Sequence, residues 1–265
     1  VYICSDSATG IFSGIYEAWR RKDQQDSGIA LAGHVEPELF CTYEEVEENR
    51  EKAAAVDRMI CRHLGGTAYQ EISQAVLSDD PGRGDVILGT MMEARHIPDS
   101  RRIMEHLTHP DVEKVFELSR RVGSEAHALK GFVRFRELKG GILCAVIRPK
   151  CQVLPCLAPH FEERLPKENW MIYDKSHRMF AVHESGRRWV LVWAEESCLK
   201  EFCLEELEVS EQEKRYEKLW RGFCETISIS EREDKKAQAQ HLPFRFRPYM
   251  TCLLYTSPSP RDSTS

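Results

Sequence analysis

The spacing of apolar residues changes near residue 131, and this change constrains the fold more than any other feature of the chain. Before it, Val112, Val115, Ser119, Val122 and Ala126 recur at alternating three- and four-residue intervals, which is typical of the buried face of a helix. After it, apolar residues fall in short runs that alternate with polar residues, which is typical of strands. The sequence therefore predicts an α+β fold, with a helical N-terminal half and a sheet in the C-terminal half.

Helix ends are the clearest signals in the first half. A short strand is predicted at 2–4 and another within 40–46, and apolar residues between 11 and 19 recur at helical spacing. Asn49 is a favourable N-cap for a helix that Gly65 would end. Pro110 suits the first position of a later helix, which we expect Gly131 to terminate.

The second half predicts a mostly antiparallel sheet of about five strands. The strand-like runs are 132–136, 142–148, 170–174, 179–183 and 188–193. The turn Lys139, Gly140 and Gly141 favours an antiparallel hairpin between the first two runs. A short helix is expected to begin near Pro159, and a final helix is expected at 211–227.

The chain is expected to form a single domain over residues 1–251. It would comprise a helical region over residues 1–130, a sheet region over residues 131–194, and C-terminal helices with an arm over residues 195–251. Residues 252–262, CLLYTSPSPRD, resemble the translation of a sequencing adapter, so we expect 252–265 not to be native. The start at Val1, inside a strand-like run, suggests either that the front of the chain is trimmed or that translation began at an alternative codon.

Several classes of protein receive no support from the sequence. No apolar run reaches the roughly 18 residues of a membrane helix and no signal-peptide pattern is present, so the expected compartment is the cytoplasm. Phosphate-loop and dinucleotide-binding glycine motifs are missing, and the ten cysteines form no CxxC pair. His96, His106, His109 and Asp111 are metal-ligand types without a recognised spacing. We therefore expect no cofactor and no metal.

Charge is distributed unevenly along this chain of net charge −6. Acidic residues gather in 36–51 and 195–217, which are solvated faces or surfaces for a basic partner. Basic residues gather between 130 and 150, where Glu137 alone opposes them, and again near the C-terminus. The basic residues are Lys130, Arg134, Arg136, Lys139, Arg148, Lys150, Arg245 and Arg247.

The first strand of the predicted hairpin suggests a nucleic-acid surface. If Val133 and Phe135 face the core, then Phe132, Arg134 and Arg136 share the opposite face, because side chains alternate along a strand. An aromatic ring between two guanidinium groups can stack a base and neutralise phosphates. The alternative is that helices cover this face and the arginines pair with the acidic runs.

Three residues are candidate catalytic groups, and each has a structural alternative. His127, at the edge of the apolar helix stripe, is either a general base or phosphate contact, or a half-buried structural residue. His160 would lie in the first turn of the helix beginning at Pro159, where backbone N–H groups favour anions, or would mark an ordinary helix start. Asp174 ends a strand, where it either orients His160 or accepts a proton, or only forms a turn.

The runs EAHALKGFVRFRELKGG, IRPKCQVLPCLAPHFEERLPKENWMIYD and HLPFRFRPYM resemble the hallmarks of a bacterial family of uncharacterised proteins linked to DNA metabolism or repair. The resemblance spans nearly the whole of residues 1–251. It implies a radical-SAM partner that is itself proposed to modify or repair DNA, and some members carry a uracil-DNA-glycosylase-like domain. It supplies no catalytic residue.

Three hypotheses follow. The first is a nucleic-acid-binding component of a DNA repair or modification system that acts with the radical-SAM partner. The second is an enzyme, a lyase or hydrolase acting on a damaged nucleotide, which requires His127, His160 and Asp174 in one cleft. The third is an adaptor whose acidic runs dock the partner, which requires the basic hairpin to be buried or neutralised.

Overall fold

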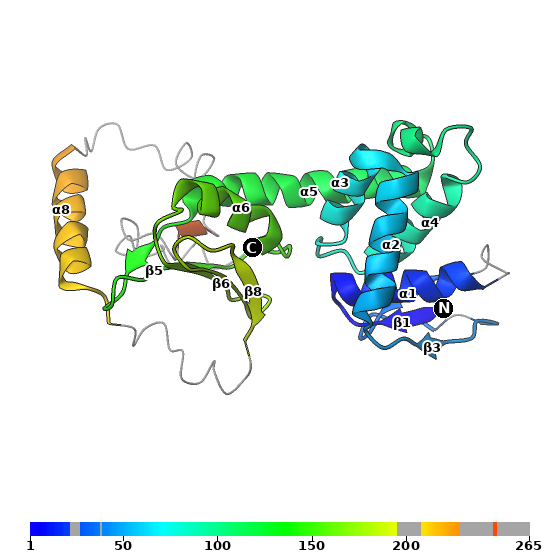
Figure 1. Ribbon diagram of the computed structural model, residues 1–265, viewed down its shortest axis with the longest axis horizontal. Helices are drawn as coiled ribbons and strands as arrows, with labels where there is room; N and C mark the ends of the chain where they lie inside the picture. The colour runs from blue at the N-terminus through cyan, green and yellow to red at the C-terminus, as the bar shows by residue number, and fades with distance from the viewer. Residues whose placement is uncertain (22–26, 38, 195–207, 228–245, 248–265) are drawn as a thin grey trace, which may run out of the picture. The chain divides into compact units, whose positions relative to one another are not determined.

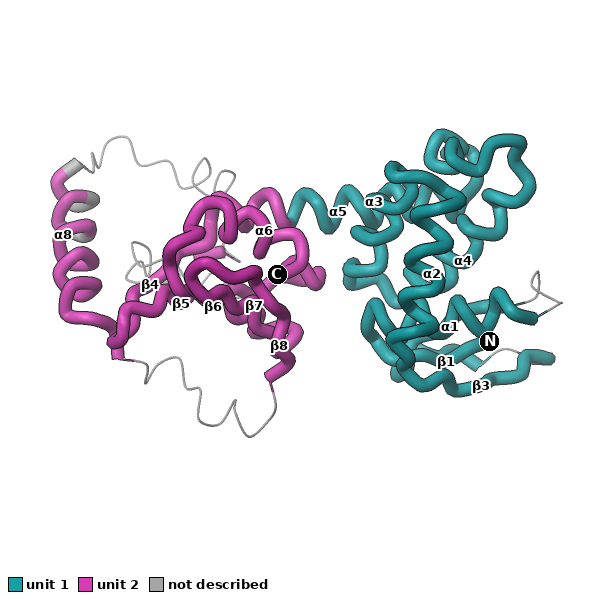
Figure 2. The backbone as a smooth tube through the Cα atoms, in the orientation of Figure 1, with its two compact units in different colours: residues 1–125 teal, residues 126–265 magenta. Residues whose placement is uncertain are grey.

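The computed structural model describes residues 1–21, 27–37, 39–194, 208–227 and 246–247. Its contacts divide the chain into two compact units, residues 1–125 and 126–265 (Figure 2). Helices dominate the first unit and a five-stranded sheet forms the second, so the predicted α+β class is confirmed. Within the described ranges, no helix is long and apolar enough to cross a membrane.

The first unit contains a small parallel sheet. Its strands β1 (Tyr2–Cys4), β2 (Ile29–Leu31) and β3 (Glu44–Glu45) lie in the order β2-β1-β3, and both pairs are parallel. Parallel neighbours need a crossover, and α1 (Ala8–Arg20) provides it between β1 and β2 (Figure 1). The strands β1 and β3 were predicted, whereas β2 was not.

Helices cover the rest of this unit. Asn49 caps α2 as predicted, since its side chain accepts hydrogen bonds from the amides of Glu51 and Lys52. Gly65 follows the end of α2 with a φ of 82°, a conformation that glycine adopts without steric cost. The helical elements are α2 (Arg50–His63), α3 (Gly65–Ala75), α4 (Arg83–Glu93), the 3₁₀ helix η2 (Ser100–Glu105) and the first turns of α5 (Pro110–Phe132).

A buried arginine joins three segments of the first unit. The side chain of Arg83 is only 2% exposed. Its Nε donates to the Val76 carbonyl at 2.9 Å and its Nη1 to the Asp80 carbonyl at 3.0 Å. Its Nη2 pairs with the carboxylate of Asp6, in the loop between β1 and α1. The guanidinium therefore ties that loop to the end of α3 and the start of α4.

The sheet of the second unit has the order β4-β5-β6-β7-β8. The β5–β6 pair is parallel and the other three pairs are antiparallel, so the predicted mostly antiparallel sheet of five strands is confirmed. The strands are β4 (Arg136–Glu137), β5 (Leu143–Ile147), β6 (Trp170–Asp174), β7 (Met179–His183) and β8 (Val190–Trp193).

The start of this sheet differs from the prediction. Gly131 does not end α5, because the amide of Val133 still donates to the Leu129 carbonyl at 2.8 Å and both side chains are buried. A glycine inside a helix costs about 1 kcal/mol, which burial of the neighbouring apolar groups outweighs. Phe132 is therefore the last residue of α5, and β4 is only Arg136–Glu137. The hairpin itself is confirmed, although it is shorter than expected.

The helix α6 (Leu154–Arg164) forms the crossover between the parallel strands β5 and β6. It begins five residues before the predicted start at Pro159, which lies inside the helix. Only one backbone bond is lost there, because proline lacks the amide that would bond to the carbonyl four residues earlier. The buried face of α6 includes Leu157 and Phe161, and the Phe161 ring lies 6.4 Å from the ring of Trp170.

The helix α8 (Glu211–Ile227) matches its predicted bounds. It lies beside β4 (Figure 2), where Glu217 Oε1 is 3.0 Å from Nη2 of Arg136. An isolated antiparallel bridge between Leu138 and Val209 brings the chain before α8 to the same end of the sheet. Acidic residues of this region are thus placed against the basic hairpin.

Candidate functional site

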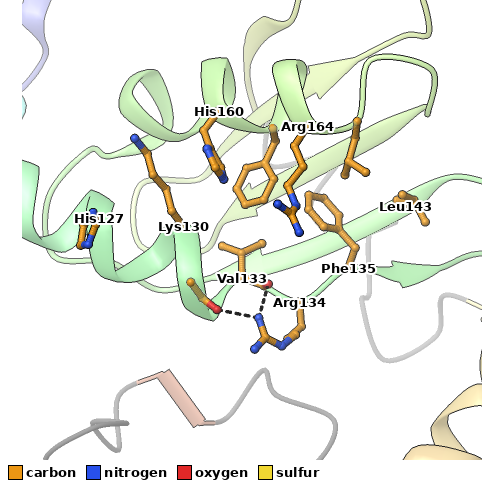
Figure 3. A pocket seen from close by; sticks show the side chains of 11 residues that line it. His127, Lys130, Val133, Arg134, Phe135, Leu143, His160 and Arg164 are labelled. Atoms are coloured by element: carbon orange, nitrogen blue, oxygen red, sulfur yellow. Dashed lines mark hydrogen bonds between the residues drawn. The ribbon is translucent and has the colours of Figure 1, made fainter.

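A cavity of about 690 Å³ opens in the second unit where the end of α5 faces α6 (Figure 3). We call it the basic pocket. Its walls come from the last turns of α5, the connection to β4, strand β5 and helix α6. Its lining residues are His127, Lys130, Gly131, Val133, Arg134, Phe135, Leu143, His160, Phe161, Arg164 and Leu165.

The described lining residues carry positive charge without a compensating carboxylate. Lys130, Arg134 and Arg164 are permanent cations, and none of the described residues that line the pocket is acidic. Lys130 extends from α5 toward α6, whereas His160 and Arg164 extend from α6 toward α5 (Figure 3). Neither Lys130 nor Arg164 forms an ion pair with another described residue, and both are exposed. An anion entering the pocket therefore meets charges that are available to it.

The other wall of the pocket is apolar and aromatic. The rings of Phe135 and Phe161 meet edge to face at a centroid distance of 5.1 Å. Phe161 is 4% exposed and belongs to the core, whereas Phe135 is only half-buried. A planar ligand group can thus contact Phe135 without displacing the core.

Helical spacing explains why the sequence places these groups together. Leu157 and Phe161 are four residues apart and face the core, and His160 and Arg164 repeat the same spacing on the neighbouring face of α6. On α5, His127 and Lys130 are three residues apart and share one face in the same way. In each helix, the two basic residues therefore lie beside a buried face, and burial of that face fixes the position of the helix.

Arg134 provides a hydrogen-bond donor for backbone carbonyls at the C-terminal end of α5. Its Nη1 donates to the carbonyl of Gly131 at 2.8 Å and to that of Val133 at 3.0 Å (Figure 3). Free carbonyls at a helix C-terminus repel anions, and a cation placed there offsets that effect. Arg134 thus makes the C-terminal end of α5 more tolerant of a nearby anion.

The predicted strand face of Phe132, Arg134 and Arg136 does not exist, because only Arg136 belongs to β4. Phe132 ends α5, and its ring lies 5.0 Å from that of Phe246. Arg136 donates from Nε to Glu217 at 3.0 Å, and Lys139 pairs with Glu208. Side chains do not alternate here as predicted, because Phe132 ends a helix and residues 133–135 belong to neither a helix nor a strand.

His160 also lies elsewhere than predicted. Because α6 begins at Leu154, His160 is in the second turn, and the argument from free amides in a first turn does not apply to it. The structure nevertheless brings His160 into the same pocket as His127. The two imidazoles enter it from different helices.

Asp174 is not among the residues that line the pocket. It is fully buried, and its Oδ1 accepts hydrogen bonds from the amides of Ser176 at 2.9 Å and His177 at 3.2 Å. Its Oδ2 lies 2.6 Å from Nδ1 of His177. These contacts are those of a turn-forming aspartate.

Of the two C-terminal arginines, only Arg247 belongs to the described residues. Arg245 lies outside the described residues, and Arg247 is half-buried and does not line the cavity. Sequence reasoning missed Arg164, Phe135 and Phe161 as site residues. The four-residue spacing of Arg164 from His160 is the signal that would have indicated a shared helix face.

Nucleophile and metal chemistry receive little support. Burial raises the pKa of the Cys156 thiol, and the charge of Lys130 opposes only some of that effect, so the thiol stays protonated at neutral pH. In the first unit, Glu93 Oε1 lies 3.1 Å from Nδ1 of His106 and Glu93 Oε2 lies 3.8 Å from Nε2 of His109. No group of three or more potential ligands among the described residues is arranged to hold a metal ion.

Comparison with known proteins gives one match. The family model described as a domain of unknown function, DUF4130, matches residues 81–251, which is more than half of the chain. The matched range includes every residue of the basic pocket. No curated protein and no solved structure matches the chain.

Proposed function

The chain belongs to the DUF4130 family of domains of unknown function, and we propose that it is a DNA-binding protein that holds a single strand in the basic pocket. The observation that carries the proposal is the composition of that pocket. Three permanent cations and two histidines surround the cavity, no carboxylate is among its described lining residues, and an accessible phenylalanine forms one wall.

This combination suits a nucleic acid strand because the strand carries both matching groups. Its phosphates pair with lysine and arginine, and each base that stacks on an aromatic side chain contributes about 1 to 3 kcal/mol. A single strand exposes its bases, whereas a duplex keeps them stacked inside. The half-buried ring of Phe135 therefore favours single-stranded over duplex DNA.

The cellular role is proposed on the family resemblance of the sequence. That resemblance supports DNA rather than another polyanion, and a role in DNA repair or modification. It also supports a radical-SAM protein as the partner. We propose that this chain supplies the strand-binding surface and that the partner supplies the chemistry.

A non-DNA-binding adaptor is the second candidate, and one observation favours it. The cations of the hairpin are neutralised within the chain, Arg136 by Glu217 and Lys139 by Glu208, as the adaptor hypothesis requires. The pocket cations Lys130 and Arg164 lie outside this neutralised region. They are the residues that discriminate between the two candidates.

An independent enzyme activity is less well supported. The lyase or hydrolase hypothesis needs His127, His160 and Asp174 in one cleft. The pocket brings the two histidines together, but Asp174 is engaged with His177 and does not line the cavity. We do not assign a reaction to the pocket on two histidines alone.

The test is binding of the full chain to fluorescent single-stranded and duplex DNA across a salt series at neutral pH. The informative variant is Lys130→Ala with Arg164→Ala. Lys167→Ala with Arg188→Ala is the matched control, because it removes one lysine and one arginine from exposed positions of the same unit that do not line the pocket. Both double variants change the net charge equally.

Counterion release sets the expected size of the effect. The slope of log K against log salt is negative, and each lost phosphate contact makes it less steep by about 0.7 for a single strand, so two lost contacts make it less steep by about 1.4. The control should keep the slope of the unmodified chain. Equal DNA binding by the two double variants would contradict the DNA-binding proposal, and so would a lack of DNA binding by the unmodified chain at low salt. Either result would favour the adaptor candidate.

A further inference from the structure

We infer that the basic pocket accepts one nucleotide unit, its phosphate between Lys130, His160 and Arg164 and its base against Phe135. The inference rests on the proposed function, which it sharpens from a strand to a single nucleotide. The ligand would be a nucleotide at a strand end or one turned out of its stack. A free nucleoside monophosphate carries the same groups and serves as the probe.

The size of the pocket supports one nucleotide. Its volume of about 690 Å³ falls within the range of about 300 to 1,000 Å³ that is usual for sites of small ligands. The cavity opens between two helices of one unit, so a nucleotide can enter it from solvent. A base paired within an intact duplex cannot reach such a wall without leaving its stack.

The pocket is also polar at one end and apolar at the other. Figure 3 shows His127 and Lys130 at one end, Phe135 and Leu143 at the other, and Arg164 between them. A nucleotide has the same polarity, with a phosphate at one end and a planar base at the other. Inorganic phosphate would use only the basic end, and a nucleoside only the aromatic end.

The basic end can also distinguish a terminal phosphate from an internal one. A phosphomonoester carries more than one negative charge at neutral pH, whereas an internal phosphodiester carries one. Lys130 and Arg164 provide two permanent charges, and the ring nitrogens of His160 add a further donor. A 5′-phosphorylated strand should therefore compete better for the pocket than the same strand without its phosphate.

The experiment measures binding of thymidine monophosphate, thymidine and inorganic phosphate to the full chain by calorimetry, and their competition with fluorescent single-stranded DNA. Thymidine monophosphate should bind about 5- to 150-fold more tightly than phosphate, the factor that one stacked base contributes. Phe135→Leu should remove most of this factor and leave phosphate affinity unchanged. Phe135→Tyr keeps the ring and should retain it.

The design separates a binding defect from a folding defect. Phe135 also contacts Phe161 and Trp170, so the unfolding transition of each variant is recorded beside its affinity. If Phe135→Leu weakens folding, the affinities of the unmodified chain and of Phe135→Tyr for thymidine monophosphate and for phosphate still test whether the base is recognised. Both proteins should prefer thymidine monophosphate, and Lys130→Ala with Arg164→Ala should abolish binding of both ligands.

Each outcome has a distinct meaning. Equal affinities for thymidine monophosphate and phosphate would overturn the inference, because no base would be recognised. Pocket-dependent DNA binding without competition by thymidine monophosphate would leave the proposed function standing and refute the single-nucleotide site. Tight binding of thymidine monophosphate without DNA binding would support the nucleotide site and refute the DNA-binding proposal.

Discussion

Replacing Arg83 should destabilise the first unit chiefly through two backbone carbonyls, not through its ion pair. Arg83→Met keeps much of the apolar stem and removes the guanidinium from a site where the side chain is 2% exposed. The carbonyl of Val76 then loses the donor Nε, whereas the carbonyl of Asp80 loses Nη1 but keeps the backbone amide of residue 83 at 3.3 Å. The carboxylate of Asp6 loses its partner too, but its side chain is 56% exposed and can be solvated.

The magnitudes follow from the exposure of each group. An orphaned buried carbonyl such as that of Val76 costs about 1 to 3 kcal/mol, and the partly buried carbonyl of Asp80 adds up to about 1 kcal/mol. The ion pair with the exposed Asp6 contributes at most about 1 kcal/mol. We therefore expect Arg83→Met to lower the free energy of unfolding by roughly 2 to 4 kcal/mol. Asp6→Asn should lower it by about 1 kcal/mol or less.

Amide hydrogen exchange under native conditions is the suitable assay, because it reports on each unit separately. Four of the five tryptophans lie in residues 126–265, so total fluorescence would be dominated by the second unit. The free energy of exchange is read from protected amides of β1 and of the buried face of α1. Amides of β6 in the second unit serve as the internal reference.

Two results would refute this reasoning. If Asp6→Asn costs as much as Arg83→Met, the charge pair dominates and the carbonyls matter little. If Arg83→Met costs less than about 1 kcal/mol, the carbonyls find other donors or water when the guanidinium is removed.

Three further predictions concern local features. Asn49→Ala should lower the free energy of unfolding by about 0.5 to 2 kcal/mol, seen as faster exchange of α2 amides, since the amides of two first-turn residues lose their acceptor; unchanged exchange would contradict the capping role. Burial raises the pKa of Cys144 from 9.0 to about 11, so its contribution to stability is full below pH 9 and is lost as pH rises toward 11, by about 2 to 3 kcal/mol. Urea unfolding of Cys144→Ala at pH 8 and 10.5 should show less alkaline loss than the unmodified chain, and equal loss would exclude this thiol. Gly10→Ala should destabilise α1 by about 1 to 3 kcal/mol in the same exchange assay, since the added Cβ would lie 2.7 Å from the Ser5 carbonyl oxygen. A stabilised helix would show that the loop containing Ser5 moves away from the added methyl group.

Local signals in the sequence predicted those features of the fold that local interactions decide. The strand bounds of β6 and β7 and the cap at Asn49 depend on neighbouring residues, and all were predicted as the structure has them. The end of α5 was wrong because glycine is a local helix-ending signal, whereas burial of Val133 is a tertiary effect. A single sequence without knowledge of the packing offers no measure of that burial.

The same division applies to the candidate site. Lys130, Arg134, His127 and His160 were chosen as separate candidates, and the structure places all four at one cavity. Their convergence depends on α6 crossing back to the end of α5, which no pattern in the sequence specifies. Asp174 shows the opposite case, since its turn composition predicted the local role that its hydrogen bonds display.

The basic residues of the pocket can change without loss of the fold. Lys130 and Arg164 are exposed side chains on helices whose opposite faces are held in the core. Substitutions of exposed residues usually change stability by less than about 0.5 kcal/mol. If the pocket binds a ligand as we propose, exchange of these two cations would change the preferred ligand while the scaffold stays the same. Ligand preference in this family should consequently vary faster than the fold, and the identities of residues 130 and 164 are where that variation should be read.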